Sequence, residues 1–338
     1  MKFGSVPLSQ AAGKLLAHNV PALDGRKLFT KSHQLTPDDV ETLRAMGLTS
    51  VVVAELEADD LSENEAARRV GVALAGSGVR VVAPGVGRAN LSAEVRGVLN
   101  IDVSTLHRVN QVDEGITVAT LRRCSVVQAR QLLALVKIIP FAMPQRQLEA
   151  VEAIIAETGK VITLTPLEAQ SIALIVSGPD HMRDKLLAEF TDPVRTRMET
   201  LGSQLEAITY VPHQPSAIAA AIQAQHAAKR GLIILAGISA IIDRGDVAPT
   251  GLVQAGGEVE HFGAPVDPGS LLMLGYLHGM PVLGAPGCIK SLKVNIIDWI
   301  VPRLLTGEHL TGRDIMLMGH GGLLDDIEDR PMPRHREE

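Results

Sequence analysis

Short apolar runs alternate with longer amphipathic segments in the second half of the chain. The runs at 171–178, 205–212 and 231–237 are rich in Ile, Leu, Val and Ala and stop at glycine or proline, which is typical of buried strands. Apolar residues at helical spacing fill 181–201 and 215–229 between them. Strands that alternate with helices predict right-handed crossovers and a largely parallel sheet.

The same alternation continues to about residue 305. The pattern predicts a helix at 246–255, a strand at 258–263, a hairpin-like pair of strands within 270–287 and a long helix at 288–305. We therefore expect an α/β domain with three layers, a mostly parallel sheet with flanking helices.

The first half is less regular. Thr36 and Pro37 are placed to begin a helix that Gly47 ends, and the strand 51–53 follows it. Further short helices and extended segments alternate without a fixed order up to about residue 165. This mixture predicts a smaller α+β accessory domain that precedes the α/β domain.

These patterns suggest three parts. We expect the accessory region at 1–168, the α/β domain at 169–306 and a C-terminal segment at 307–338. The end of that segment, 328–338, is charged and poor in apolar residues, which predicts a frayed tail or the beginning of a linker.

Composition excludes several classes of partner. Aromatic residues make up only 2% of the 338 residues and the net charge is −6, which argues against nucleic-acid binding. We predict no membrane span and no signal peptide, and hence the cytoplasm as the location. Cys124 and Cys288 lie far apart, without the spacing of a disulfide framework or a zinc site.

Three loops follow predicted strands at 176–180, 236–246 and 284–288, and each contains a glycine at or near the strand end. In open parallel sheets, ligands collect outside the carboxyl ends of the strands. Glycine permits close backbone approach, and the N–H groups at the start of the next helix favour anions such as phosphate. The alternative is that these glycines only end strands.

The polar side chains of these loops suggest a site with one part that binds phosphate and another that holds a metal or accepts protons. Ser239 can donate a hydrogen bond to a phosphate, and Lys290 and Lys293 can supply positive charge from the predicted helix after Gly287. Asp243 and Asp246 cannot bind a phosphate directly, but they can hold Mg²⁺ or accept protons from a ligand. The alternative for both aspartates is helix N-capping.

At these residues the sequence resembles the molybdopterin-binding (MoaB/Mog-like) domain family, which molybdopterin molybdotransferases, molybdopterin adenylyltransferases and gephyrin-like proteins share. The resemblance covers about 170–306 and extends to an N-terminal segment similar to that of the molybdotransferases. The whole chain looks most like the molybdopterin-binding half of a bacterial protein type in which a cytidylyltransferase-like domain follows. The segments that carry it are "IVSGPD", "AGIS", "RGDVAPTG" and "PGCIKS".

The resemblance implies specific roles. Asp246 corresponds to the family's essential aspartate, which would be catalytic, with Asp243 beside it, and would bind the metal. The positions that would contact molybdopterin are Ser177, Gly178, Gly237, Ser239, Pro286, Gly287, Lys290 and Ser291. Mg²⁺ and ATP or another nucleotide are the further ligands that the resemblance implies.

The chain departs from the family at several of its positions. Where the family has an acidic pair after its second strand, this sequence has His213 and Gln214, so one expected carboxylate is missing. Ala236 replaces a glycine and Cys288 replaces an asparagine. His213 is either a base or a surface group. Cys288 is either a thiol of lowered pKa at a helix start or a packing residue.

Three hypotheses follow. The chain is an enzyme of molybdenum cofactor biosynthesis that transfers adenylyl or molybdate groups, or a non-catalytic module that presents molybdopterin to a nucleotidyltransferase or a molybdoenzyme. Alternatively, it is an unrelated nucleotide-binding α/β protein. A homo-oligomer is expected by analogy with the family. The turn around His320 carries only a weak signal.

Overall fold

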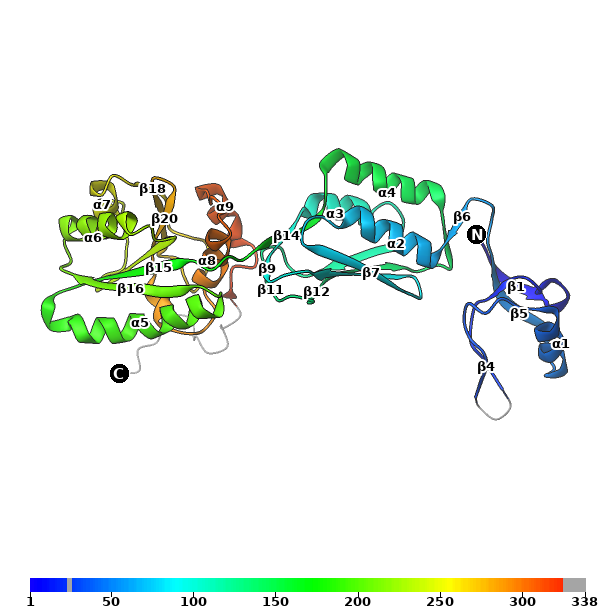
Figure 1. Cartoon of the computed structure of the whole chain (residues 1–338). Coiled ribbons are helices and arrows are strands. Elements are labelled where there is room, and N and C mark those ends of the chain that lie inside the picture. Colours follow the sequence, from blue (N-terminus) through cyan, green and yellow to red (C-terminus); the bar gives the residue numbers. More distant parts are fainter. Residues whose placement is uncertain (23–25, 325–338) are drawn as a thin grey trace, which may run out of the picture. The chain divides into compact units, whose positions relative to one another are not determined.

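The chain divides after Thr165 into two units, Met1–Thr165 and Pro166–Glu338. The structure is a computed structural model that describes residues 1–22 and 26–324 (Figure 1). The predicted tail at 328–338 lies outside the described residues. None of the helices in the described ranges has the length and apolar character needed to cross a bilayer.

Antiparallel sheets and helices are intermixed in the first unit. Its larger core lies between the sheet β10-β12-β8-β7 and the helices α2, α3 and α4, and a smaller sheet, β1-β5-β2, packs with α1. The predicted start of α1 is confirmed, with Thr36 as its N-cap and Pro37 as its first residue, and Thr36 also forms a capping box with Asp39.

The helices of this unit are α1 (Pro37–Ala45), α2 (Glu63–Leu74), α3 (Val103–Asn110) and α4 (Gln145–Thr158), with the 3-10 turn η1 (Leu8–Gln10). The strands are β1 (Lys2–Pro7), β2 (Leu15–Leu16), β3 (Val20–Pro21), β4 (Lys27–Phe29), β5 (Ser50–Glu55), β6 (Asp60–Ser62), β7 (Val79–Gly85), β8 (Arg88–Ala93), β9 (Gly97–Ile101), β10 (Ile116–Thr120), β11 (Val126–Val127), β12 (Leu132–Ile138), β13 (Ala142–Pro144) and β14 (Ile162–Pro166).

A six-stranded sheet of order β16-β15-β17-β20-β19-β18 forms the centre of the second unit. The strand pairs from β16 to β20 are parallel, whereas β19 runs antiparallel to both β20 and β18. The α/β class is therefore confirmed. The sheet is mixed because a tight hairpin joins β19 to β20, and a tight hairpin can only join antiparallel strands.

The strands of this unit are β15 (Ser171–Ser177), β16 (Gln204–Val211), β17 (Leu232–Gly237), β18 (Glu258–Phe262), β19 (Met273–Leu277) and β20 (Met280–Gly284). The helices are α5 (Arg183–Thr200), α6 (Pro215–Ala227), α7 (Val247–Gln254), α8 (Ile297–Leu305) and α9 (Gly312–Met316), with the 3-10 turns η2 (Asp180–Met182), η3 (Gly287–Lys290) and η4 (Leu317–Gly319).

Both faces of the central strands of this sheet are buried, which explains why β15 and β17 read as continuous apolar runs. In β15, Leu174 and Val176 pack with α5 and α8, whereas Ala173 and Ile175 pack with α6 and α7. Figure 1 shows α5 on one side of the sheet and α6 and α7 on the other. Ser177 continues the series of Ala173 and Ile175, so its side chain is on the α6 and α7 side.

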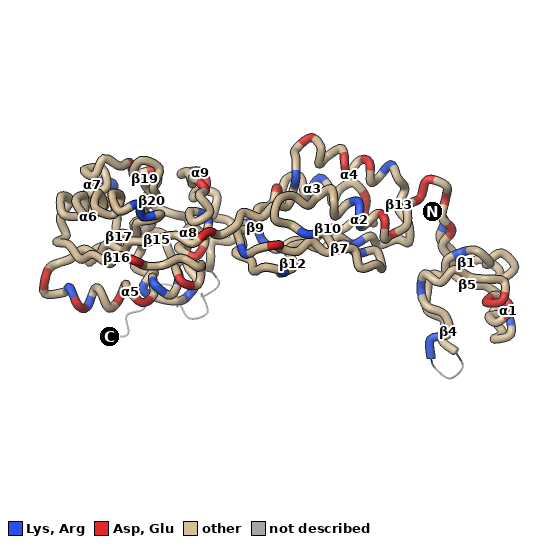
Figure 2. The backbone as a smooth tube through the Cα atoms, in the orientation of Figure 1, with Lys and Arg blue, Asp and Glu red and all other residues tan. Residues whose placement is uncertain are grey.

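Charged residues of both signs are interspersed along the two units (Figure 2). This distribution agrees with the modest net charge of −6. It also means that any recognition of a charged ligand has to come from the local arrangement of a few groups.

Candidate functional site

The three predicted glycine loops lie at one edge of the sheet. β15, β17 and β20 are parallel neighbours, and their registers place Ser177 beside Gly237 and Leu235 beside Gly284. The loops after Ser177, Gly237 and Gly284 therefore leave from the same end of adjacent strands. This is the edge at which ligands bind in open α/β sheets.

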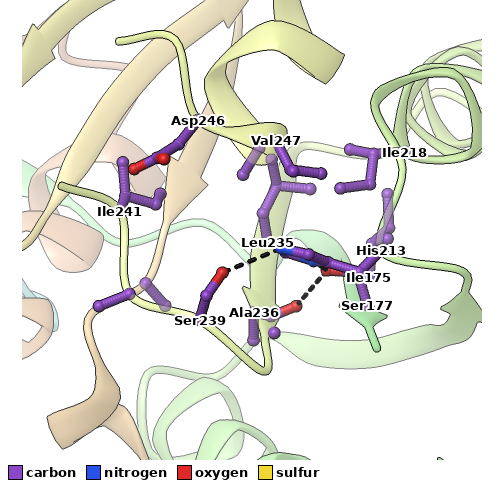
Figure 3. A pocket seen from close by; sticks show the side chains of 14 residues that line it. Ile175, Ser177, His213, Ile218, Leu235, Ala236, Ser239, Ile241, Asp246 and Val247 are labelled. Atoms are coloured by element: carbon purple, nitrogen blue, oxygen red, sulfur yellow. Dashed lines mark hydrogen bonds between the residues drawn. The ribbon is translucent and has the colours of Figure 1, made fainter. Parts of the chain in front are cut away.

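A chain of hydrogen bonds crosses this edge. Ser177 Oγ lies 2.9 Å from Nδ1 of His213, and Nε2 of His213 lies 2.9 Å from Ser239 Oγ. His213 comes from the loop between β16 and α6, and Ser239 from the loop after β17. Figure 3 shows the imidazole between the two hydroxyl groups.

The surroundings of Ser177 favour one tautomer of His213. The Ser177 hydroxyl donates a long hydrogen bond of 3.4 Å to the carbonyl oxygen of Ala236. A hydroxyl that donates there accepts from the imidazole, which places the proton on Nδ1. Nε2 then carries the lone pair that accepts a hydrogen bond from the Ser239 hydroxyl.

Burial keeps the imidazole neutral. Desolvation lowers the pKa of His213 below 6.5, and the nearby Asp246 carboxylate opposes this shift. Because the first effect is the larger one, His213 is a neutral base at pH 7.

The Asp246 carboxylate is used within its own loop. Its Oδ2 accepts the backbone N–H groups of Ile242 at 2.6 Å and Asp243 at 2.9 Å. These two bonds lower the pKa of Asp246. Asp246 occupies the N-cap position of α7, but its side chain makes no capping bond, so capping by this side chain is a wrong alternative.

Asp243 has a local role as well. Its Oδ1 accepts the N–H of Gly245 at 2.7 Å, and its carbonyl accepts the N–H of Asp246. The two predicted catalytic aspartates are thus linked to each other through the loop backbone. Asp243 does not line the hollow described next.

A hollow of about 20 Å³ adjoins Ser177, His213 and Ser239. This volume holds one water-sized group, so it admits a phosphate oxygen or a methyl group, and a pterin ring would lie outside it. The full lining is Ile175, Ser177, His213, Ile218, Leu235, Ala236, Gly237, Ser239, Ala240, Ile241, Asp246, Val247, Ala248 and Ala285. The predicted residues outside this lining are Gly178, Asp243, Pro286, Gly287, Lys290, Ser291 and Lys293.

The predicted glycines differ in whether their surroundings leave room for a Cβ atom. A Cβ on Gly237 would lie 2.6 Å from Ser177 Oγ and 3.0 Å from the Ser177 carbonyl oxygen. A Cβ on Gly178 would lie 2.6 Å from the hydroxyl of Tyr210. A Cβ on Gly287 would meet open space. Close packing therefore explains Gly178 and Gly237, and nothing in the backbone contacts explains Gly287.

The predicted helix at 288–305 is wrong over its first half. Only the short turn η3 and α8 form, and the chain between them wraps around the buried side chain of Arg197 from α5. The Arg197 guanidinium donates to the carbonyls of Ile289, Ser291 and Lys293 and pairs with Asp298 at 3.0 Å. Because these carbonyls bind a side chain, they cannot propagate a helix.

Lys290 is directed to the α5 side of the sheet. Its ammonium group pairs with Glu189 at 2.5 Å and lies 4.6 Å from the centre of the Phe190 ring. Both residues belong to α5, on the face opposite the helices that border the hollow. The Ser291 hydroxyl accepts the N–H of Lys293, which makes it part of the loop around Arg197.

The pKa of Cys288 is raised by burial. The alternative of a reactive thiol with a lowered pKa is therefore wrong, because apolar surroundings disfavour the thiolate. The half-buried position of Cys288 agrees with the packing alternative.

The site does not fit Mg²⁺. No group of three or more His, Cys, Asp or Glu side chains within residues 1–22 and 26–324 is arranged to hold a metal. Mg²⁺ requires oxygen ligands in near-octahedral geometry. The hollow offers one carboxylate, that of Asp246, which already accepts two backbone N–H groups, and an imidazole where a second carboxylate was expected.

The role of Ser177 in orienting His213 was not foreseen. The sequence did contain a signal, because Ser177 is the single polar position in the odd-numbered series after Ser171 in an otherwise apolar strand. Buried hydroxyls need a partner. What the sequence could not show was that the partner is a histidine from the neighbouring strand's loop.

A family model matches the beginning of the chain. Residues 5–55 match a family model described as "Domain of unknown function (DUF8806)". No curated protein matches the chain.

Solved structures of molybdenum cofactor biosynthesis proteins are similar at a coarse level. One from Pyrococcus furiosus has 12% identity and a TM-score of 0.25, over 92% of this chain and 65% of that one. A molybdopterin biosynthesis moeA protein from Pyrococcus horikoshii has 12% identity and a TM-score of 0.31, over 93% and 76% of the two chains. The chain thus spans about 65% of the first of these structures. The likeness is too coarse to place any residue of the site.

Proposed function

We propose that the second unit binds molybdopterin, or its nucleotide or molybdenum form, through the ligand's phosphate group. Support comes from the resemblance of the loops around Ser239 and Asp246 to molybdopterin-binding domains and from the position of these loops at one sheet edge. The observation that carries the proposal is the small hollow in which His213 and Ser239 meet the beginning of α7.

The hollow offers donors to an anion. The N–H groups of Val247 and Ala248, in the first turn of α7, have no acceptor within the helix, and both residues line the hollow. Ser239 can donate its hydroxyl proton to the anion once His213 takes up a proton, because Nε2 of the imidazolium then donates to Ser239 Oγ instead of accepting from it. Together these groups suit one phosphate oxygen in the hollow, with the pterin on the open side.

The ligand is held without a metal in this proposal. Mg²⁺ does not fit the groups around the hollow, so metal-dependent adenylyl or molybdate transfer has no support from this site. A binding module that presents the cofactor to a nucleotidyltransferase or a molybdoenzyme needs only the donors. We therefore propose that the chain acts in molybdenum cofactor biosynthesis as such a module.

Anaerobic titration of the full chain with molybdopterin in EDTA tests this function. We expect saturable binding that EDTA does not weaken, and a loss of about tenfold or more in Ser239→Ala, since a hydrogen bond to a charged group contributes about 1.5–3 kcal/mol. Lys290→Ala, whose ammonium group pairs with Glu189, serves as the matched control and should bind as the wild type does.

Three outcomes contradict the proposal in different ways. Binding that requires Mg²⁺, together with turnover of added ATP, would establish the enzyme instead. Binding of ordinary nucleotides but of no pterin would establish an unrelated nucleotide-binding protein. Equal losses in Ser239→Ala and Lys290→Ala would place the phosphate elsewhere.

A further inference from the structure

The hydrogen-bonded chain from Ser177 through His213 to Ser239 has the order of a nucleophile, a base and an orienting group. Serine nucleophiles are weak on their own and are activated by an adjacent base within about 2.6–3.2 Å, which a third group holds in place. Both links here measure 2.9 Å. Ser239 is at the end of this chain that is open to the loop, whereas Ser177 is buried.

Each partner is in the state that this chemistry requires. The contact of 3.4 Å from the Ser177 hydroxyl to the Ala236 carbonyl favours the tautomer of His213 that has its proton on Nδ1 and its acceptor, Nε2, toward Ser239. Burial lowers the pKa of His213, so the base is unprotonated at neutral pH. Asp246 is the charged group that faces the imidazole, and it opposes this shift only in part.

The loop after β17 also supplies unused donors. Within the described residues, the backbone N–H groups of Ala240 and Ile241 donate to no protein acceptor, and both residues line the hollow beside Ser239. Backbone N–H groups next to a nucleophile stabilise the oxyanion that forms during acyl transfer.

We propose that Ser239 is the nucleophile of an acyl-transfer site that accepts short-chain esters, with His213 as the general base and Ser177 as a positioning residue. The hollow of about 20 Å³ fits the methyl group of an acetyl ester. Its apolar walls, Ile175, Ile218, Leu235 and Ile241, suit that methyl group.

The reaction balances with water as the only further reactant. Nε2 of His213 takes the hydroxyl proton of Ser239 while Oγ bonds to the acyl carbon. The imidazolium returns that proton to the departing alkoxide as the ester C–O bond breaks, which leaves an acyl-serine and an alcohol. Water then attacks the acyl-serine, gives a proton to Nε2, and the serine leaves with that proton, so that a carboxylic acid is released.

Covalent labelling of the full chain with an alkyl fluorophosphonate tests the nucleophile. The Ser239 oxygen displaces fluoride from phosphorus, and mass spectrometry of a digest locates the adduct. We expect the adduct on Ser239, a rate that rises with pH to a midpoint below 6.5, the ordinary pKa of a histidine, and no adduct there in Ser239→Ala. General-base catalysis contributes about 10²–10⁴-fold, so His213→Ala should label at least about a hundredfold more slowly.

Added imidazole separates a chemical role of His213 from a structural one. It should restore part of the labelling of His213→Ala, which a merely misfolded loop would not allow. Ser177→Ala should slow labelling less than His213→Ala and move the pH midpoint, because Nδ1 loses the partner that fixes the tautomer. Ser104→Ala and His107→Asn on α3 of the first unit are the matched controls, and both should label as the wild type does.

Hydrolysis of p-nitrophenyl esters then tests the substrate class. Acetate should react faster than octanoate, since the hollow has room for a methyl group only. The proposal is overturned if folded wild-type chain gives no adduct on Ser239, or if His213→Ala labels at the wild-type rate. Labelling requires no pterin, so its failure is distinct from a failure of molybdopterin binding.

Discussion

Ser239 Oγ and Nε2 of His213 lie 2.9 Å apart although the two residues are 26 positions apart in the chain. The sheet order explains this contact. β16 and β17 flank β15 on opposite sides, so the loops after them reach toward each other over the end of β15. The side chain between them at that end is Ser177.

Alanine substitution of Gly237 and of Gly287 should distinguish a glycine that packing requires from one that packing does not require. Gly237→Ala should destabilise the second unit by about 1–3 kcal/mol, because its Cβ would approach the fixed carbonyl oxygen of Ser177. Gly287→Ala should change stability by less than about 0.5 kcal/mol, since its Cβ meets open space. Urea unfolding followed by the fluorescence of Trp299, the chain's single tryptophan, measures both.

The same pair tests the predicted phosphate role of Gly287. If that glycine approaches a ligand closely, Gly287→Ala will weaken molybdopterin binding even though stability is unchanged. We expect no such loss, because the hollow that holds the phosphate in our proposal does not include Gly287.

Arg197 should be the residue on which the loop 287–296 depends. Arg197→Met removes the partner of three carbonyls and of the half-buried Asp298 carboxylate. The free energy of unfolding should fall by at least about 1–3 kcal/mol, the cost of one buried acceptor left unsatisfied. Trp299 lies next to Asp298, so its emission reports the change directly.

Arg195→Ala is the control for this loss. Arg195 is on the same helix and pairs at 3.6 Å with the exposed Asp192, a type of pair that contributes about 0–1 kcal/mol. Equal unfolding midpoints for Arg197→Met and Arg195→Ala would mean that the loop is held in some other way.

The sequence predicted those helices and strands that depend on the local pattern of apolar residues. β15 and β17 were predictable because both faces of each strand are buried, and α7 was predictable from its apolar spacing. The interruption of the helix predicted at 288–305 depends on Arg197, which is more than 90 residues away in the sequence. No window of neighbouring residues contains that information.

The candidate site was predicted unevenly for the same reason. The edge of the sheet followed from the strand pattern, and Ser239 followed from its place after a strand. The side chains of Lys290 and Ser291 point to partners on other elements or within their own loop. Sequence spacing gives the loop to which a residue belongs, but not the face of the sheet on which its side chain lies.

Removal of the Asp246 charge should lower the pKa of His213 further, because that carboxylate raises it. Asp246→Asn keeps an oxygen that can accept from Ile242 and Asp243, so the loop should persist. Histidine resonances followed by NMR across pH 4–8, a range of about four units around the ordinary histidine pKa, give the shift. An increased or unchanged pKa of His213 in Asp246→Asn would show that the carboxylate does not face the imidazole.

The stability of the chain should decrease as the pH is lowered through the titration of His213. Its pKa is lowered from 6.5 in the folded chain, so the unfolded chain binds a proton first as the pH falls. The free energy of unfolding then decreases as the pH falls from about 6.5 to the folded pKa and levels off below it. Asp246 acts in the same direction only at lower pH, because its own pKa lies below 3.8.

The difference between wild type and His213→Asn isolates this contribution from the chain's other histidines. Urea midpoints from Trp299 fluorescence should be measured for the two proteins at several pH values. They should differ at about pH 7.5, roughly one unit above the ordinary histidine pKa of about 6.5. They should converge at low pH, where the wild type has lost the stability that its neutral imidazole contributes. Parallel curves over the whole range would mean that the imidazole is solvated, and a solvated imidazole would be protonated too readily to serve as the neutral base that Ser239 requires.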